Sequence, residues 1–524
     1  MKAIDIIEKK KNNEKLEYKE IEYMVNSYVK GKINDKTMSD FVWQIYYNGL
    51  NIEDLNCDYD LVVKDEVFLN FRDYLLEHKD RRYLLVGDYD FDGIAATVIM
   101  KRLLNHLGIA SNHYIPSRIK EGYGVNESII DKAINYHFDT IILLDNGIVA
   151  SDCINKARLN NIDVLIIDHH EYSELPDASL IIHDRLVDKK YSELSAAGLC
   201  FILSLTVYED ELSLVLGAVA VLSDMMKVLG FNRYLLNKMI KAVNSQESMR
   251  LLNDGKNISF QDLSFNIIPK INAVSRMEPE GNPNLLIRFF NDAEYAREYI
   301  EKINYLNNKR KQETKLMYEE ALRIMDGSSI SIIASSSFRE GLCGLIANKL
   351  LGNFAHPFIV LNIENGLCKG SGRSPEGFNM YEQLKGFEDF EAFGGHYSAV
   401  GLSVKLDKLK ALKDYTDNLQ FEDNVQKDVL ILDDDLLNDS SIELIESFEP
   451  YGNGFKMPLM AIENRGYRKF IVSNRYPKFT VSSRVSAICF HEEMKNADGR
   501  YFIGTLRRDS YRNGCISFVI EDII

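Results

Sequence analysis

Long apolar runs, paired cysteines and proline are all scarce in this chain of 524 residues. No stretch reaches the roughly 18 uninterrupted apolar residues that a membrane-spanning helix needs. The N-terminal residues, up to about position 45, are strongly charged and contain no apolar segment of the kind found in a signal peptide. We therefore expect a cytoplasmic protein without a membrane partner.

The seven cysteines are scattered along the chain and form no CxxC pair. An odd number without close pairs argues against a disulfide framework and against a zinc site built from thiolates. No long stretch has the composition of a disordered segment, and 46% of the residues are hydrophobic. At roughly 100–200 residues per domain, the chain is long enough for about three or four folded domains with reduced thiols.

Short apolar runs alternate with helical stretches after residue 82. Three of these runs are predicted to be buried strands, namely Tyr83–Gly87, Thr140–Leu144 and Val164–Ile167. Helices are expected between them, over 93–107 and 152–159. Continuous apolar strands that alternate with helices predict an α/β domain with a parallel, doubly wound sheet.

The other segments have different patterns. Residues 1–80 show helical periodicity around Ile21–Tyr28 and Phe41–Tyr47, which predicts a helical lead-in. A long charged helix is expected over 292–326, followed by a second α/β region with glycine-rich loops at 369–373 and 394–395. After residue 426, short apolar fragments alternate with turn residues, which indicates a small β-barrel.

Acidic residues and histidines follow each of the three predicted strands. They are Asp88, Asp90 and Asp92 after the first, Asp145 after the second, and Asp168-His169-His170 after the third. Because the carboxyl ends of parallel strands meet at one edge of a sheet, these residues are expected to converge in one crevice. A helix N-cap explains any one of these aspartates taken alone, but it does not explain three such strand ends together.

Several carboxylates in one crevice repel one another unless a cation neutralises them. Aspartate with histidine and without cysteine favours Mn²⁺ or Mg²⁺, and the imidazole tilts the choice toward Mn²⁺. Enough ligands are present for two ions ~3.5–4 Å apart, which is the arrangement for in-line attack on a phosphate. The sequence therefore predicts a metal-dependent phosphoesterase.

The net charge of −16 argues against nucleic-acid binding by the chain as a whole. Residues 456–512, however, contain 12 Lys and Arg against 5 Asp and Glu. This imbalance is typical of a basic nucleic-acid-binding module attached to an acidic body. A chance bias of the surface is the alternative, and charge alone does not decide between the two.

Taken together, these motifs resemble those of the DHH phosphoesterase superfamily. Val86–Gly93 resembles its first motif, Asp145-Asn146-Gly147 its second, Asp168-His169-His170 its third and Val221–Asp224 its fourth. Within the superfamily, the segments at 114–124, 271–276, 370–374, 394–396 and 450–454 resemble the RecJ family. The resemblance covers residues 82–524 and leaves the N-terminal residues unmatched.

The resemblance implies a role for each matching residue. Two Mn²⁺ ions, with Mg²⁺ as an alternative, would be held by Asp90, Asp92, Asp145, His169 and Asp224, with Asp145 as the bridging ligand. The residues acting in catalysis would be His170, Asp145 and Asp88. Of these, Asp88 would contact the metal ligands and orient them without binding a metal itself. The residues contacting substrate phosphates would be Arg118, Arg276, Arg373, Gly394, Gly395 and His396.

The resemblance also implies a division into five parts. These are a helical N-terminal part (1–80), a DHH catalytic domain (81–290), a connecting helix (291–326), a DHH-associated domain (327–425) and an OB-fold nucleic-acid-binding domain (426–524). In the last part, the candidate contacts with a strand are Arg468, Lys469, Phe470, Arg475, Tyr476, Lys478 and Phe479.

The implied activity is an exonuclease on single-stranded DNA, or RNA, that digests 5′→3′ in repair and recombination. The resemblance favours a monomer that works with a helicase or a single-strand-binding protein. Two alternatives stay open: a phosphodiesterase for short oligoribonucleotides or cyclic dinucleotides, and a non-catalytic replication or repair scaffold. Departures from the RecJ pattern at His183-Asp184, Val274-Ser275 and Phe338-Arg339 put substrate contacts, not metal binding, in doubt.

Overall fold

The computed structural model describes residues 2–524 except positions 13, 15, 35, 39, 42–58, 329, 420–428, 474–475, 491, 510–511 and 513. Its internal contacts divide the chain into two compact units. The larger unit contains residues 61–226 and 238–425, and the smaller contains 1–60, 227–237 and 426–524. Most of the helix predicted over Phe41–Tyr47 lies outside the described residues. The five-part division remains a prediction.

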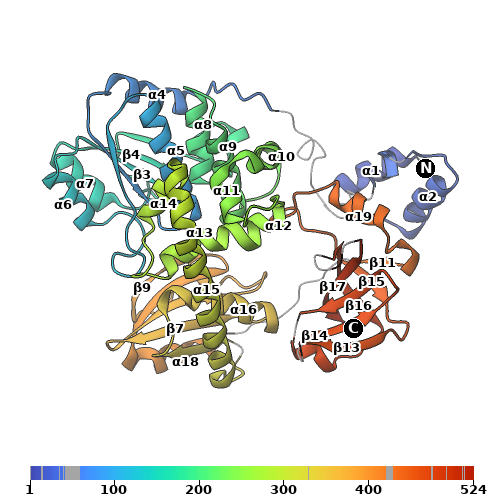
Figure 1. Cartoon of the computed structure of the whole chain (residues 1–524). Helices are drawn as coiled ribbons and strands as arrows, with labels where there is room; N and C mark the ends of the chain where they lie inside the picture. The colour runs from blue at the N-terminus through green and yellow to red at the C-terminus, as the bar shows by residue number, and fades with distance from the viewer. Residues whose placement is uncertain are drawn as a thin grey trace. The chain divides into compact units, whose positions relative to one another are not determined.

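A five-stranded parallel sheet begins the larger unit (Figure 1). Its strands are β1 (Tyr83–Gly87), β2 (Ser111–Tyr114), β3 (Thr140–Leu144), β4 (Asp163–Asp168) and β5 (Leu180–His183). Their order is β2-β1-β3-β4-β5, and each neighbouring pair is parallel. β1 and β3 are buried along their whole length, which accounts for their uninterrupted apolar sequences. The predicted fold class is confirmed.

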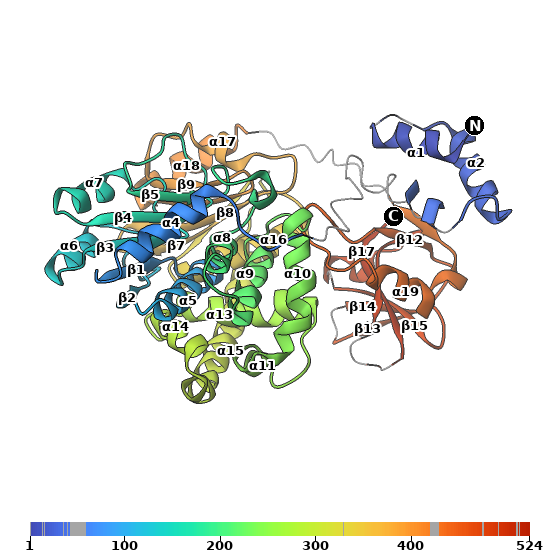
Figure 2. The same cartoon turned by 90° about the horizontal axis from the view of Figure 1, so that it is seen from above.

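Helices cover both faces of this sheet (Figures 1 and 2). On one face, α6 (Glu127–Asn135) and α7 (Ser151–Leu159) share an apolar core with β1, β3 and β4. On the other face, α5 (Phe91–His106) packs against β1 and α8 (Ala196–Leu205). There α4 (Glu66–Glu77) packs against α8 and β5. Helices on both faces make the sheet doubly wound.

A run of helices leads from this sheet to the long helix α15 (Ala293–Ile324). They are α9 (Glu211–Ser223), α10 (Gly230–Ala242), α11 (Glu247–Leu252), α12 (Phe260–Asp262), α13 (Ile268–Arg276) and α14 (Asn284–Asn291). At 1.5 Å per residue, the 32 residues of α15 extend over about 48 Å. This helix packs against α13 and α14 and against the second α/β region, and it is the charged helix that the sequence predicts.

The second α/β region contains a mixed sheet in the order β6-β7-β8-β10-β9. Its strands are β6 (Ser331–Ser335), β7 (Phe358–Glu364), β8 (Leu367–Arg373), β9 (Phe390–His396) and β10 (Ala399–Lys405), accompanied by α16 (Cys343–Phe354), α17 (Met380–Leu384) and α18 (Leu409–Thr416). The prediction of glycine-rich loops at 369–373 and 394–395 is wrong, because both segments lie in strands paired with β10. Glycine is needed there for close packing: a Cβ on Gly370 would lie 2.0 Å from the carbonyl oxygen of Val360.

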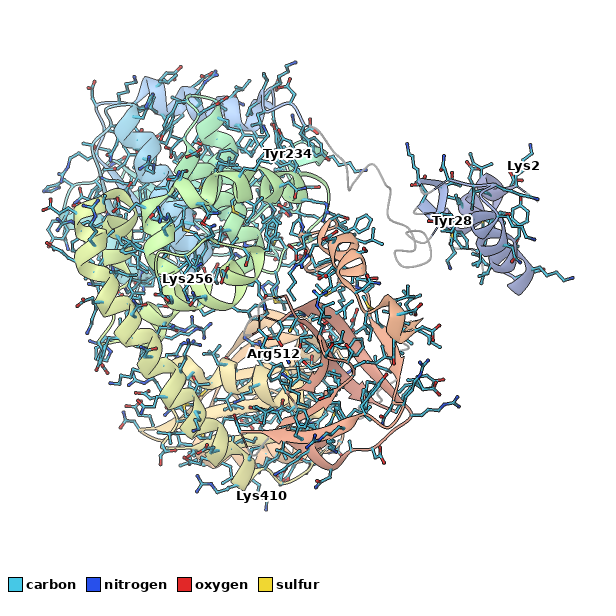
Figure 3. The ribbon with its side chains drawn as sticks, turned by 45° about the vertical axis from the view of Figure 1, so that its right-hand side comes forward. Lys2, Tyr28, Tyr234, Lys256, Lys410 and Arg512 are labelled. Carbon is cyan, nitrogen blue, oxygen red and sulfur yellow. The ribbon has the colours of Figure 1, made fainter. Side chains whose placement is uncertain are left out.

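The smaller unit contains two helices near the N-terminus and a seven-stranded sheet. The helices α1 (Ala3–Lys11) and α2 (Tyr18–Val29) share a small core, and Lys2 and Tyr28 mark the two ends of this pair (Figure 3). The sheet has the order β11-β12-β16-β17-β15-β14-β13. Its elements are β11 (Leu430–Leu432), α19 (Asp439–Glu446), β12 (Met460–Glu463), β13 (Arg468–Val472), β14 (Tyr476–Thr480), β15 (Val485–Cys489), β16 (Tyr501–Arg508) and β17 (Ile516–Ile523). The β-rich C-terminal region is confirmed, while its closure as an OB fold remains a prediction.

Residues 227–237 belong to the smaller unit although they lie between α9 and the end of α10. The amide of Val228 donates to the carbonyl of Asn453 at 2.8 Å. The Arg233 guanidinium donates to three consecutive carbonyls, those of residues 448, 449 and 450, at 2.8–3.2 Å. It also lies 4.7 Å from the centre of the Phe455 ring. This segment is thus tied to the loop that precedes β12.

No helix among the described residues is long and apolar enough to cross a membrane. Six of the seven cysteines lie on described residues, and all six are free thiols, while Cys57 lies outside them.

Candidate active site

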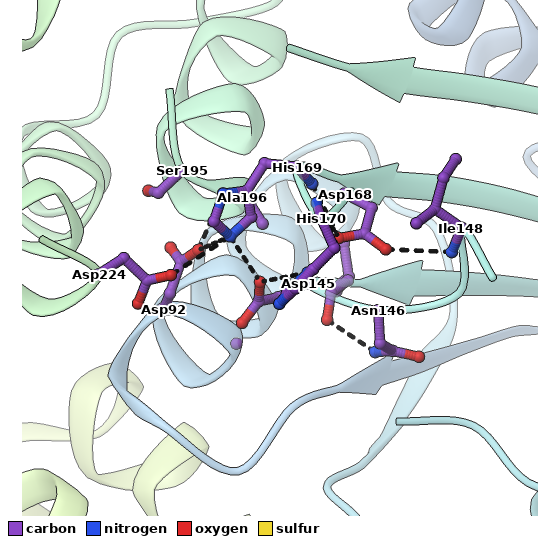
Figure 4. Close-up of polar contacts among 12 residues, drawn as sticks. Asp92, Asp145, Asn146, Ile148, Asp168, His169, His170, Ser195, Ala196 and Asp224 are labelled. Carbon is purple, nitrogen blue, oxygen red and sulfur yellow. Dashed lines mark hydrogen bonds and ion pairs between the residues drawn. The ribbon is translucent and has the colours of Figure 1, made fainter. Parts of the chain in front are cut away.

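The crevice at the carboxyl ends of β1, β3 and β4 gathers residues from all four predicted motifs (Figure 4). The strand order places the topological switch point between β1 and β3, where open α/β sheets bind ligands. Asp145 follows β3 directly and has a left-handed backbone, with φ 61°. Its amide donates to the carbonyl of Ile167 at 2.9 Å. The backbone thereby fixes Asp145 at the centre of the crevice.

Three overlapping groups of side chains in the crevice have the composition and spacing of metal sites. They consist of Asp92, Asp145, His169 and Asp224; of Asp88, Asp90 and Asp145; and of Asp145, His169 and His170. Within each group the ligand atoms all lie within 4.8 Å of one another. Asp145 belongs to every group, which is the arrangement that a bridging carboxylate requires.

Several atoms in these groups form no hydrogen bond with the described residues. His169 Nε2 lies 3.2 Å from both Asp145 Oδ1 and Asp224 Oδ2. Nevertheless, His169 Nε2, Asp145 Oδ1 and Asp88 Oδ1 are buried and form no hydrogen bond. Unpaired buried polar atoms are costly and indicate a missing partner. Because the donors are oxygen and imidazole nitrogen without sulfur, the residues fit a divalent cation such as Mn²⁺ or Mg²⁺.

Burial and mutual repulsion favour the neutral forms of the carboxyl groups in the crevice. Burial and repulsion from Asp224 raise the pKa of Asp92 to about 7. Burial and repulsion from Asp92 raise the pKa of Asp145 well above its usual value. Burial by itself lowers the pKa of His169, but the carboxylates of Asp145 and Asp224 outweigh it and hold that pKa well above the usual value. A bound cation would neutralise the same carboxylates.

The two aspartates that begin α5 are held by backbone amides. Asp90 is the N-cap of the helix and accepts hydrogen bonds from the amides of Asp92 and Gly93, at 3.1 and 3.3 Å. Asp92 accepts from the amides of Ala196 and Ala197 at 2.9 Å each, where α8 begins. A side chain on Gly93 would meet the backbone of Asp88 at 2.5 Å, so only glycine fits there. The N-cap role therefore coexists with membership of a ligand group.

Asp168 orients His170 and is not a member of any of the ligand groups. Its Oδ1 accepts from Nδ1 of His170 at 2.7 Å, and its Oδ2 accepts from the amide of Ile148 at 3.0 Å. Burial raises the pKa of Asp168, but the hydrogen bond from His170 outweighs it, and the pKa lies below its usual value. His183, one of the departures from the RecJ pattern, contacts the carbonyl of His170 at 2.9 Å through Nε2.

The second α/β region contributes His396 to the same crevice. The His396 ring stacks beside that of His170, with 5.9 Å between centroids. Burial, together with repulsion from His170, lowers the pKa of His396. Gly395 has φ 142°, and a Cβ there would lie 2.3 Å from the carbonyl oxygen of Ala399. A Cβ on Gly394 would meet no protein atom within 4 Å, so the space beside it is open.

Four arginines from four elements form what we call the arginine cluster. They are Arg118 after β2, Arg276 at the end of α13, Arg310 on α15 and Arg373 at the end of β8. Among the described residues no guanidinium of the cluster forms an ion pair, and those of Arg276, Arg310 and Arg373 donate to backbone carbonyls and an amide side chain. Burial, then repulsion from the other three, lowers the pKa of Arg276 to about 9. Several guanidinium groups so close together suit an anion that they can share.

The candidate contacts in the C-terminal sheet divide between its two faces. Phe470 on the edge strand β13 is 40% exposed and pairs with Lys478 on β14. Phe479 points the other way and is only 4% exposed, in the core of the sheet. The prediction that Phe479 contacts a strand is therefore wrong, because strand alternation buries it. Lys469 lies over the Phe479 ring, and Arg475 falls outside the described residues.

The predicted excess of positive charge is confined to part of this region. Residues 426–524 contain 13 Lys and Arg against 15 Asp and Glu. Arg484 pairs with Asp439 of α19 at 2.8 Å, and Arg508 pairs with Glu446 of the same helix at 2.8 Å. The acidic helix therefore offsets part of the charge that residues 456–512 carry.

Sequence reasoning missed the contacts that arise from tertiary packing. The amides at the start of α8, the hydroxyl of Tyr123 on the carbonyl of Asp145 at 2.7 Å, and Arg310 are examples. Ser195, followed by Ala-Ala-Gly, signals a helix start and thus free amides, but it does not indicate which acid they receive. Arg310 lies within a helix rich in charge, where no sequence signal separates it from its neighbours.

Two family domains match this chain. Residues 82–221 match the DHH family, N-terminal domain, and residues 328–420 match the DHHA1 domain. The single-stranded-DNA-specific exonuclease RecJ of Bacillus subtilis is 30% identical over 447 residues, which are 79% of this chain and 57% of that protein. The RecJ exonuclease of Escherichia coli is 26% identical over 453 residues, 76% of this chain and 78% of that protein. The chain thus spans little more than half of the Bacillus relative.

Solved structures of RecJ share this fold. RecJ from Thermus thermophilus in complex with Mn²⁺ has a TM-score of 0.79 at 22% identity, covering 93% of this chain and 76% of that one. An exonuclease RecJ bound to manganese has a TM-score of 0.59 at 25% identity, covering 69% and 95%. The two matched domains, the similarity in sequence and the common fold show that this chain is similar to the RecJ exonucleases and contains the two domains of the DHH family models.

Proposed function

We propose that this chain is a divalent-metal-dependent exonuclease that hydrolyses single-stranded DNA, with two Mn²⁺ as the preferred ions and Mg²⁺ as an alternative. The observation that carries the proposal is Asp145, which belongs to every ligand group and keeps a buried oxygen that forms no hydrogen bond with the described residues. Bound ions at such a site stabilise negative charge on a phosphate and lower the pKa of water. The substrate comes from the names of the relatives, which are single-stranded-DNA-specific exonucleases.

The metal ligands in this proposal are Asp90, Asp92, Asp145, His169 and Asp224. Asp88 is a further candidate, because its buried Oδ1 lacks a hydrogen-bond partner and belongs to a group with Asp90 and Asp145. His170 donates from Nδ1 to Asp168, and its Nε2, which lies 3.2 Å from the Tyr123 hydroxyl, would contact the phosphate at the scissile bond. His396, whose ring stacks beside His170, would contact the same or the next phosphate.

The arginine cluster would bind the phosphates of the strand beyond the scissile bond. Guanidinium groups bind phosphate oxygens through two parallel hydrogen bonds, and Arg118, Arg276 and Arg373 form no ion pair with described residues that would compete. Open space beside Gly394 allows a phosphate to approach the strand there. The exposed face of β13 and β14, with Arg468, Phe470 and Lys478, would hold the strand farther away.

The remaining features of the proposal come from the RecJ resemblance. They are 5′→3′ digestion, a role in DNA repair and recombination, action as a cytoplasmic monomer, and cooperation with a helicase or a single-strand-binding protein. Single-strand binding by the C-terminal sheet belongs to the same proposal.

A labelled single strand of a few dozen nucleotides tests the proposal. It would be incubated with Mn²⁺, Mg²⁺ or EDTA, and Asp145→Asn would be the control, since asparagine tolerates the left-handed backbone at this position. Mononucleotides released from a 5′ label, only with metal and only by the unsubstituted protein, are the expected result. Cleavage limited to di- to tetranucleotides or cyclic dinucleotides would favour the short-substrate phosphodiesterase, and no cleavage of any substrate would favour the scaffold.

A further inference from the structure

Residues 339–344, which comprise the turn before α16 and the first two residues of that helix, contact two members of the arginine cluster. We call this stretch the joint segment. Arg276 Nη1 donates to the carbonyl of Gly341 at 3.1 Å, and a Cβ on Gly341 would lie 2.7 Å from the carbonyl oxygen of Arg276. A Cβ on Gly344 would lie 3.2 Å from Nη2 of Arg373. Two of the four arginines therefore pack on this segment.

A third arginine is connected to the joint segment through Glu278. This glutamate is 7% exposed, and its carboxylate accepts hydrogen bonds from the hydroxyl of Ser117 and, at 3.4 Å, from the amide of Arg118. The carbonyl of Glu278 in turn accepts from Nη1 of Arg339 at 3.1 Å. Arg339 is thus linked, through one residue, to the loop that carries Arg118.

Arg339 is anchored on its other side by the long helix α15. Its Nε donates to Glu313 at 2.7 Å and its Nη2 to the same carboxylate at 3.3 Å. Its Nη2 lies 3.7 Å from Glu280, which pairs with Lys309 at 2.5 Å. All three nitrogens of the guanidinium are used, and a planar fork of this kind fixes direction as well as distance. Arg339 therefore connects α15, the turn after α13 and the joint segment.

We infer that Arg339 and Glu278 are positioning residues, which set the spacing of Arg118 and Arg276 relative to Arg373 and thereby the affinity for a phosphate-bearing strand. The inference deepens the proposed function and rests on it. Like-charged guanidinium groups repel one another, so the cluster holds its spacing in the free protein only if other contacts fix it. Among the described residues, Arg339 contacts none of the proposed metal ligands. We therefore expect its substitution to change strand binding and not hydrolysis.

Substitution of Arg339 by methionine tests the inference, since it keeps an apolar stem and removes all three contacts. We expect KM for a long single strand to rise about tenfold with kcat within about twofold. Hydrolysis of bis(p-nitrophenyl) phosphate with Mn²⁺ is expected to stay the same, because this diester has no phosphate beyond the scissile one. Arg339→Lys retains the charge but not the planar guanidinium. Its KM is expected to lie between those of the unsubstituted protein and Arg339→Met.

Two controls separate positioning from general damage. Lys413→Met removes an ion pair of the same region, Lys413–Asp326 at 3.2 Å, that does not contact the cluster, and it is expected to leave KM unchanged. In a protein that already carries Arg118→Gln, Arg339→Met is expected to raise KM by less than it does alone, because coupled residues are not additive. Equal effects in both backgrounds would contradict the inference.

Binding without hydrolysis distinguishes this inference from the proposed function. Fluorescence anisotropy of a labelled oligothymidylate with Ca²⁺ in place of Mn²⁺ measures affinity alone. A chain that binds but never cleaves refutes the proposed function, while a tenfold weaker affinity of Arg339→Met still supports the inference. Unchanged affinity in Arg339→Met, a fall in kcat with KM constant, or no binding by the unsubstituted protein would overturn it.

Discussion

The acidic crevice and the arginine cluster are two crowded sets of like charges in the same unit, with opposite sign. In the crevice, burial and neighbouring carboxylates raise the pKa of Asp88 and Asp90. In the cluster, burial and the Arg118 guanidinium lower the pKa of Arg373. In both sets the pKa shifts favour the neutral form of the side chains, because each set has too few groups of opposite charge among the described residues.

The two regions differ in how far the protein itself compensates them. In the crevice, backbone amides bind Asp90 and Asp92, and His169 lies among the carboxylates. The guanidinium groups of Arg276, Arg310 and Arg373 donate only to carbonyls and an amide oxygen, and no guanidinium of the cluster forms an ion pair with a carboxylate of the described residues. A small cation therefore suits the first region, whereas the second suits a larger anion that several guanidinium groups can share.

The largest expected effect comes from breaking the centre of the acidic crevice. Asp145→Asn keeps the shape and the backbone but removes the charge that the ligand groups share. We expect kcat on a single strand with Mn²⁺ to fall on the order of 10³-fold or more. Binding of the same strand with Ca²⁺, measured by anisotropy, should change less than about threefold. Comparable losses in both assays would mean that the crevice and the strand site are not separate.

The second largest effect is expected in the arginine cluster. Arg276→Gln removes a partly buried guanidinium that its neighbours repel, and we expect strand affinity to fall roughly 10- to 100-fold. The same change relieves repulsion in the free protein, so the melting temperature should stay constant or rise. A variant with a lower melting temperature and unchanged affinity would indicate a structural role instead. Calorimetry and anisotropy on one preparation measure both quantities.

Metal and pH should act together on stability. The pKa of Asp92 is about 7 in the folded protein, against 3.8 as its ordinary value. Between those values the folded state holds more protons than the unfolded state, so the free energy of unfolding of the metal-free protein should fall as pH rises from about 4 to 7. Mn²⁺ should raise the melting temperature by several degrees, and more at about pH 7.5 than at about pH 5.5, because its ligands must be deprotonated. Asp145→Asn should lose most of this increase.

The smallest effect on strand binding is expected in the C-terminal sheet, where packing and not charge determines stability. Phe479→Ala should lower the free energy of unfolding of the smaller unit by about 3–5 kcal/mol, because the ring lies in the core. Phe470→Ala should leave stability within about 1 kcal/mol but weaken binding of a long strand a few-fold. Thermal melts and anisotropy separate the two. Equal loss of stability in both variants would contradict the assignment of the two faces.

Sequence patterns predicted the features that depend on local periodicity. β1 and β3 were predicted to the residue, since a fully buried parallel strand is a continuous apolar run. The convergence of Asp88–Asp92, Asp145 and His169 also follows from the sequence, because the carboxyl ends of parallel strands share an edge. Strand ends do not predict the positions of Arg310 or Glu278. These two residues reach the arginine cluster because of the way the helices pack together.

The two wrong predictions have a common physical origin. The glycines at 370 and 372 suggested loops because glycine is usually a turn residue, yet here it allows neighbouring strands and side chains to approach closely. Phe479 was grouped with Phe470 by composition, although residues an odd number of positions apart on paired strands can face opposite sides. In both cases the identity of the strand partner, which a single sequence does not contain, determined the outcome.

The segment at 227–237 makes the two units topologically inseparable. The chain passes from one unit to the other four times, and one of the returns begins three residues after Asp224. A protein shortened at residue 425 would retain Val228 and Arg233 but lose the carbonyls of Pro450 and Asn453 that hold them. In such a protein the segment at 227–237, which begins three residues after the predicted metal ligand Asp224, would lose these contacts. Deletion would therefore confuse loss of a strand-binding surface with damage to the metal site, and single changes on β13 are the cleaner way to examine the C-terminal sheet.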